Sequence, residues 1–270
     1  MEFYVEVEQN VRVLVNDINP FGNKTILFIH GWPANHKMFE YQYNQLVAAG
    51  YRCIGIDTRG FGKSDKPLTG YHYDQLADDI LAVIQTLGLQ DVTLVGHSTG
   101  GAIALRYVAR HRGYAVSKLV LAASAAPSLV QLPNFPYGQR SEDIEKNFIE
   151  GTAQDRPKML RDFGEVFFHK QVSHPFSDWF FNLGLEAASW STIAIAKMWL
   201  AENLFTDLPL VQVPTLIMHG IHDQVVPYDL GIIQHQGIRN SKLVTFEDSG
   251  HGLFYDEREK FNWELMQFIG

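Results

Sequence analysis

The sequence predicts an α/β fold, in which a mostly parallel eight-stranded sheet carries helices on both faces and a helical cap is inserted late in the chain. Short apolar runs, which are typical of strands covered on both faces, alternate with helix-length segments. That alternation stops near residue 125 and resumes near residue 208. In addition, a glycine-rich turn around Ser98 joins one apolar run directly to a helix-forming run.

The strands expected in the first part of the chain differ in pattern. Residues 3–7 and 11–15 alternate apolar and polar side chains, which predicts two antiparallel edge strands. Residues 26–29, 53–56 and 92–95 are almost continuously apolar, so we expect three strands buried on both faces.

The remaining core elements continue the alternation. Gly50 and Gly88 each follow a helix-length segment. Since glycine commonly ends a helix, we take these two residues as helix ends. We expect helices at 38–49, 74–87, 99–111 and 257–268, and further strands at 119–121, 214–218 and 242–246.

Residues 125–207 have a different character. They contain many aromatic residues and four prolines up to Pro157, and they show no strand-like alternation. We predict a helical cap over the carboxyl edge of the sheet, where open α/β folds bind ligands. The core domain then consists of residues 1–124 and 208–270.

Ser98 is the predicted nucleophile. It lies in Gly-x-Ser-x-Gly between an expected strand and an expected helix, which is the context of a nucleophile elbow. A serine at such a sharp turn is exposed, and Gly96 and Gly100 remove side chains that would clash there.

A serine hydroxyl needs a base, usually a histidine oriented by a carboxylate, and in this kind of fold the chain order is serine, acid, histidine. Asp223 follows the first strand after the insertion, with Asp229 a little further on. His251 follows the last strand and is the final histidine of the chain. We therefore predict a triad of Ser98, Asp223 and His251. His219 and His222 have no further ligand cluster nearby, so no metal site is predicted.

Acyl transfer also needs hydrogen-bond donors for an oxyanion. The backbone N–H of Thr99, the residue after the nucleophile, is one candidate. Trp32, in the loop after residues 26–29, is the other, and Pro33 restricts its backbone to extended conformations. We expect Trp32 and Val226 to contact the substrate as well, and His30 to brace the loop.

The motifs together resemble the α/β-hydrolase superfamily. They are His30-Gly31-Trp32-Pro33, the run 57–64, Gly96-His97-Ser98-Thr99-Gly100-Gly101, His219-Gly220 with Asp223, and Gly250-His251-Gly252. More narrowly, the chain resembles cofactor-free haloperoxidases, a group with esterase and perhydrolase activity. The resemblance implies the same triad and oxyanion donors and no cofactor. Ile221 departs from the pattern, because many relatives have an aspartate there.

The composition excludes several classes of partner. The net charge is −8 for 270 residues and no Lys/Arg-rich run occurs, which argues against nucleic acid. No apolar run reaches the ~18 residues of a membrane span, and the acidic first residues do not form a signal peptide. The single cysteine, Cys53, is expected to be buried in a strand, and it fits a cytoplasmic location. Nothing indicates the oligomeric state.

The expected function is hydrolysis of small carboxylic esters, with a metal-free perhydrolase or haloperoxidase side activity. A lactonase, a carbon–carbon hydrolase and a proline iminopeptidase-like enzyme remain alternatives, because all use such a triad. A non-enzymatic alternative is a small-ligand receptor with vestigial activity, which repeated turnover of esters would distinguish from an enzyme.

Overall fold

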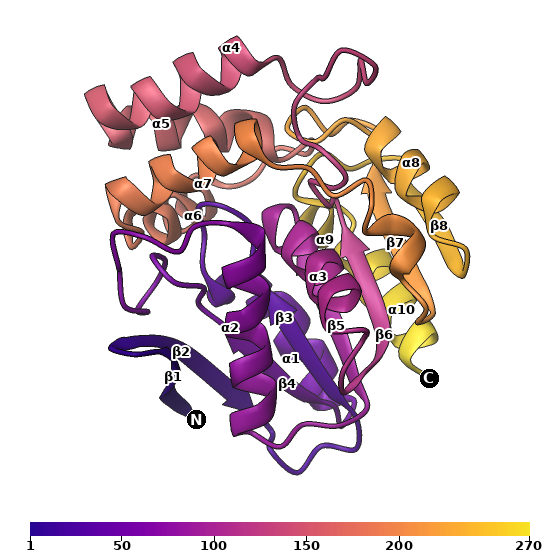
Figure 1. The fold of residues 1–270 in the computed structure, drawn as a ribbon. Coiled ribbons are helices and arrows are strands. Elements are labelled where there is room, and N and C mark those ends of the chain that lie inside the picture. The colour runs from indigo at the N-terminus through magenta and orange to yellow at the C-terminus, as the bar shows by residue number, and fades with distance from the viewer.

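The computed structural model describes residues 1–270 and contains one eight-stranded sheet, with strand order β1-β2-β4-β3-β5-β6-β7-β8 (Figure 1). β1 and β2 pair antiparallel with each other, β2 pairs antiparallel with β4, and all later neighbours are parallel. This arrangement confirms the predicted fold class. The strands are β1 (Glu2–Glu8), β2 (Val11–Ile18), β3 (Thr25–Ile29), β4 (Arg52–Ile56), β5 (Val92–His97), β6 (Val116–Ala122), β7 (Thr215–Gly220) and β8 (Ser241–Phe246).

The core helices form two layers around the sheet (Figure 1). α2 packs on α3, and α1 packs on α10. Every residue of β5, at the centre of the sheet, is buried, as its apolar sequence predicts. The core helices are α1 (Glu40–Ala48), α2 (Tyr73–Thr86), α3 (Thr99–Arg110), α8 (Asp229–Gly237), α9 (Leu253–Asp256) and α10 (Arg258–Ile269).

Helices fill the segment between β6 and β7 and cover the carboxyl edge of the sheet (Figure 1). They are α4 (Ser141–Ile144), the π-helical turn η2 (Glu145–Glu150), α5 (Gly151–Phe167), α6 (His174–Leu185) and α7 (Ser189–Ala201), followed by the 3₁₀ turn η3 (Leu208–Leu210). We refer to α4 through α7 as the cap.

The cap helix α5 is broken near its start. Asp155 has φ −153° and ψ 79°, outside the helical region. Pro157 follows two residues later, and proline both lacks an N–H and disfavours helical backbone in the residue before it. The Asp155 carboxylate accepts a hydrogen bond from the Lys158 N–H at 3.1 Å, which caps the helix that restarts there.

Cys53 lies in β4 and is fully buried, as expected. Burial raises the pKa of its thiol to about 12. None of the helices combines the length and apolarity required to cross a bilayer.

Candidate active site

Ser98 stands at the turn between β5 and α3, with φ 56° and ψ −122°. A positive φ is strained for a residue with a Cβ. The flanking glycines are required by close packing, since a Cβ at Gly96 would lie 2.3 Å from the Gly100 carbonyl oxygen, and one at Gly100 would lie 2.4 Å from the His30 carbonyl oxygen. The structure therefore has the elbow geometry that the motif predicts.

The predicted acid and base are in contact. His251 Nδ1 lies 2.8 Å from Asp223 Oδ2, and both side chains are buried. Asp223 Oδ1 also accepts the N–H groups of Val225 and Val226, each at 2.8 Å. Burial alone would raise the pKa of the Asp223 carboxyl, but the adjacent His251 and His219 side chains outweigh burial and hold that pKa well below its usual range. Asp223 is thus an ionised carboxylate at neutral pH.

The serine and the histidine are not joined by a hydrogen bond in this structure. His251 Nε2 is buried and has no hydrogen-bond partner. Because Nδ1–H donates to Asp223, Nε2 carries the free lone pair that a proton acceptor needs. Catalytic hydrogen bonds are often long or poorly aligned before substrate binds and tighten when it does.

His97, inside the motif, was not singled out by the sequence. Its Nε2 donates to the carbonyl oxygen of His251 at 2.9 Å, and the two rings lie 4.6 Å apart. Burial lowers the pKa of the His97 imidazole well below its ordinary value, so His97 is neutral. It therefore holds the backbone of the histidine loop against the end of β5.

Both expected oxyanion donors are available. Thr99 is the first residue of α3, where N–H groups have no acceptor within the helix. The Trp32 N–H makes no hydrogen bond in the structure. His30 braces the loop as expected, because its Nε2 accepts the Thr58 N–H at 3.0 Å and its Nδ1 lies 2.9 Å from the Gly31 carbonyl oxygen.

Ser98 opens into a mainly apolar cavity of about 160 Å³, which we call the inner cavity. The Trp32 ring lines it and contacts the rings of Phe148, Phe163 and Trp199, with centroids 5.3, 5.2 and 5.0 Å away. The inner cavity is lined by Trp32, Ser98, Leu129, Gln139, Asp143, Ile144, Asn147, Phe148, Phe163, Val166, Trp199, Gln224 and Val225.

The expectation that Val226 contacts the substrate is not supported by this lining. Val226 is fully buried, and its neighbour Val225 lines the inner cavity instead. The reason is local, because the Val226 N–H bonds to Asp223 and its carbonyl oxygen accepts from His219 Nε2 at 2.9 Å. These bonds keep Val226 buried within the loop that contains Asp223, away from the inner cavity.

No group of three His, Cys, Asp or Glu side chains is placed to hold a metal ion. His219 Nε2 is hydrogen-bonded to the Val226 carbonyl oxygen. The His222 ring stacks on that of His169, with centroids 3.9 Å apart. Asp229, the other candidate acid, begins α8 and makes no hydrogen bond to His251.

Comparison with protein families decides the relationship that the motifs suggest. Residues 24–258 match the family model described as the alpha/beta hydrolase fold. The chain belongs to the α/β-hydrolase family.

Individual α/β hydrolases match along nearly the whole chain. The AB hydrolase superfamily protein YisY of Bacillus subtilis (strain 168) is 48% identical, over 99% of each chain. The non-heme chloroperoxidase CPO-A1 of Kitasatospora aureofaciens is 34% identical, over 91% of this chain and 92% of its own. Among solved structures, the esterase EaEST from Exiguobacterium antarcticum superposes with a TM-score of 0.96 at 47% identity, covering 100% of this chain and 99% of its own. The resemblance to non-haem haloperoxidases is thus confirmed at the level of sequence.

Proposed function

We propose that this α/β hydrolase cleaves small carboxylic esters, with Ser98 as nucleophile, His251 as general base and Asp223 as the carboxylate that orients it. The observation that carries the proposal is the buried Asp223–His251 hydrogen bond of 2.8 Å, which leaves His251 Nε2 unpaired on a ring 4.6 Å from that of His97, the residue before Ser98. The name of EaEST, an esterase, agrees with it.

The reaction would proceed in two similar halves. His251 Nε2 takes the proton of Ser98 Oγ as Oγ attacks the ester carbonyl carbon, and the N–H groups of Trp32 and Thr99 stabilise the oxyanion. The alcohol leaves with the proton held by His251, and Ser98 remains acylated. Water then attacks the acyl group with the same base and releases the acid.

We also propose metal-free perhydrolysis. Hydrogen peroxide attacking the acyl-enzyme in place of water gives a peracid and free Ser98, and the peracid can oxidise halide to hypohalite in solution. The name of CPO-A1 as a non-heme chloroperoxidase supports this side activity. The Trp32 carbonyl, next to Pro33, is the acceptor we propose for a hydrogen bond from peroxide.

Pro33→Leu tests the peroxide proposal. The ratio of peracid formation to ester hydrolysis should fall, and hydrolysis should be largely retained, because the N–H of Trp32 is still present. Peracid is measured from a short ester plus peroxide, with and without a chelator, which should have no effect. An unchanged ratio would leave Pro33 as a loop-stiffening residue only.

The structure weakens the aminopeptidase alternative. Recognition of a substrate ammonium group needs an unpaired carboxylate in the cavity. Asp143 is the one cap carboxylate that lines the inner cavity, and it is already paired with Arg140 at 3.0 and 3.4 Å. Hydrolysis of aminoacyl substrates should therefore be much slower than hydrolysis of uncharged esters.

A panel of p-nitrophenyl esters, lactones and aminoacyl p-nitroanilides tests the proposed function. Rapid repeated turnover of short esters, lost in Ser98→Ala, is the expected result. Faster turnover of lactones or of carbon–carbon substrates would reassign the reaction. Single-turnover labelling followed by slow release would instead favour a receptor.

A further inference from the structure

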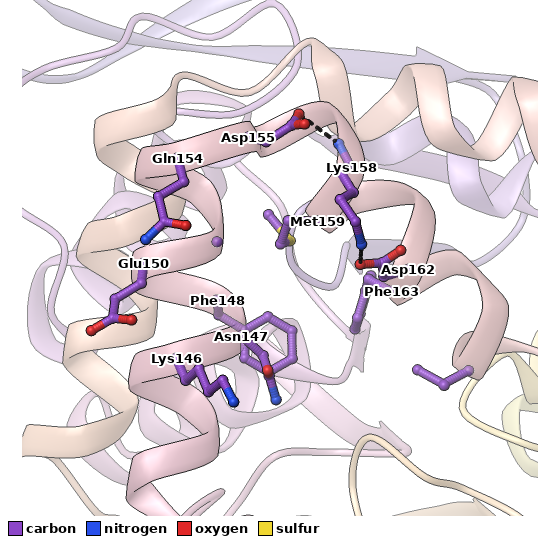
Figure 2. Close-up of a pocket in the computed structure, with 12 residues that line it drawn as sticks. Lys146, Asn147, Phe148, Glu150, Gln154, Asp155, Lys158, Met159, Asp162 and Phe163 are labelled. Atoms are coloured by element: carbon purple, nitrogen blue, oxygen red, sulfur yellow. Dashed lines mark hydrogen bonds and ion pairs between the residues drawn. The ribbon is translucent and has the colours of Figure 1, made fainter.

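A second, larger hollow lies in the cap next to the inner cavity (Figure 2). Its volume is about 620 Å³, compared with about 160 Å³ for the inner cavity. We call it the outer groove, and it is lined by side chains between residues 146 and 155 on one side and between residues 158 and 166 on the other.

The break in α5 creates this groove. η2 and the first turn of α5 form one arm, the remainder of α5 forms a second arm, and the chain reverses between them at Asp155 (Figure 2). Pro157 and the Asp155 cap keep the helix from continuing straight across the gap. The sequence at Asp155 and Pro157 therefore produces the groove, because it breaks α5 there.

The outer groove and the inner cavity are adjacent. They share Asn147, Phe148, Phe163 and Val166. Phe148 comes from the first arm and Phe163 from the second, and their rings meet edge to face with centroids 5.9 Å apart. Because both rings also contact Trp32, this aromatic pair forms the boundary between the groove and the space above Ser98.

The inner cavity is too small for a large substrate. Its volume is close to that of an engineered protein cavity that holds one benzene molecule, and below the ~300–1,000 Å³ of common ligand pockets. A substrate with a longer chain must extend past Phe148 and Phe163. The outer groove, at about 620 Å³, is the adjoining space of suitable size.

The chemistry of the groove indicates what kind of chain it accepts. Met159, which is buried, and Val166 supply apolar surface together with the two phenylalanines. The charged lining residues are three carboxylates (Glu150, Asp155, Asp162) and two lysines (Lys146, Lys158), and Lys158 already pairs with Asp162. An anionic chain end would meet more negative than positive charge, which disfavours it, and the apolar side chains of the lining favour an uncharged chain.

We infer that the outer groove binds the distal part of an uncharged, medium-chain ester whose reacting carbonyl lies at Ser98. The inference rests on the proposed function of Ser98 and extends it to a substrate class. Short esters use the inner cavity alone, whereas longer ones gain apolar contacts in the groove.

Gln154→Trp tests the inference by filling the groove. Gln154 lines the groove and is exposed, so a larger side chain is not expected to disturb the core. Ala153→Trp is the matched control, because Ala153 is also exposed on the same arm but does not line the groove. The probes are p-nitrophenyl decanoate and decyl acetate, each compared with p-nitrophenyl acetate.

In Gln154→Trp the kcat/KM ratio of at least one ten-carbon ester to p-nitrophenyl acetate should fall about ten-fold or more, the effect of removing roughly two methylenes from apolar contact. Ala153→Trp should keep the wild-type ratio. Unchanged ratios in Gln154→Trp, or equal losses in both variants, would overturn the inference while the esterase proposal stands.

If the wild type hydrolyses none of these esters, the proposed function fails, and binding decides the inference separately. Calorimetry should then show methyl decanoate binding at least ten-fold more weakly to Gln154→Trp than to wild type or Ala153→Trp. Equal affinities would refute the groove as a binding site.

Discussion

At the residue scale, Ser98 combines a reactive hydroxyl with a strained backbone. Its φ of 56° and ψ of −122° are conformations that glycine adopts more readily than serine. Such strain is of order 1–3 kcal/mol per residue, and it is tolerated where it serves to present a side chain.

Two substitutions separate these properties. Ser98→Ala and Ser98→Gly should both reduce kcat by about 10⁴–10⁶, because the nucleophile is gone. Only Ser98→Gly should relieve the backbone strain, and we expect its free energy of unfolding to exceed that of Ser98→Ala by about 1 kcal/mol. Ester hydrolysis and urea unfolding measure the two effects, and near-normal activity in Ser98→Ala would refute the nucleophile assignment.

His97 predicts a pH dependence of stability. Burial lowers the pKa of His97, and likewise that of His30, so neither takes up a proton in the folded state near neutral pH. In the unfolded chain, histidine protonates below about pH 6.5. The unfolded state therefore binds more protons as the pH falls from 7 to 5.5, and the free energy of unfolding decreases by up to about 1.4 kcal/mol per pH unit for each such histidine.

His97→Gln checks this origin. Glutamine retains a donor for the His251 carbonyl oxygen but does not titrate, so the decrease in stability between pH 7 and 5.5 should be shallower than in the wild type. Unfolding midpoints measured across that range give the two slopes. Identical slopes would mean that His97 is not neutral in the folded protein.

At the scale of elements, the sequence was most informative where side chains repeat with a clear period. The strand runs and the expected helix at 74–87 correspond closely to β3, β4, β5 and α2. The expected helix at 38–49 begins instead as a 3₁₀ turn at His36–Phe39, capped by Asn35. The four-residue α9 is too short to show helical periodicity.

In the active site too, residues that follow a recognisable strand could be predicted, whereas side-chain orientations within a loop could not. Ser98, Asp223 and His251 could be named because each follows a recognisable strand. The sequence could not predict whether Val225 or Val226 faces the inner cavity, because hydrogen bonds within the loop decide it. The role of His97 depends on a contact 154 residues away in sequence, for which the motif itself gives no signal.

Replacing a helical glycine by alanine should have opposite effects on stability at Gly101 and at Gly164. Gly101, in α3, lies so close to Ser124 that an added Cβ would be 2.6 Å from the serine Cβ, whereas Gly164, in α5, has nothing within 4 Å. Gly101→Ala should therefore destabilise the protein by about 1–3 kcal/mol through overpacking. Gly164→Ala should stabilise it by about 0.4–1 kcal/mol, because alanine restricts the unfolded chain. Thermal unfolding measures both changes, and a stabilising Gly101→Ala would contradict the close packing of α3 against Ser124.

At the scale of the whole molecule, a buried ion pair ties the antiparallel edge of the sheet to a core helix. Arg59 donates to both oxygens of Asp79 in α2, at 2.6 Å each, and to Glu8 in β1 at 2.9 Å. The Arg59 side chain is 1% exposed and that of Asp79 is 5% exposed. Removing one partner of such a pair leaves an uncompensated buried charge.

Arg59→Leu should accordingly lower the free energy of unfolding by roughly 3–5 kcal/mol. Arg12→Gln, which breaks the exposed pair with Asp65, is the control and should cost far less, because exposed ion pairs contribute little to stability. The double change Arg59→Leu/Asp79→Leu should recover part of the loss. Urea unfolding gives all three values, and equal losses for the buried and exposed pairs would contradict this account.

The burial of Cys53 makes the wild-type chain ready for single-site labelling. Its one native thiol is inaccessible and, with a pKa of about 12, is protonated at the pH of ordinary maleimide chemistry. A cysteine introduced at exposed Ala153 would then be the only thiol that reacts. A spin label or fluorophore at that position would report on the first cap arm alone when substrate is added, with the native cysteine left in place.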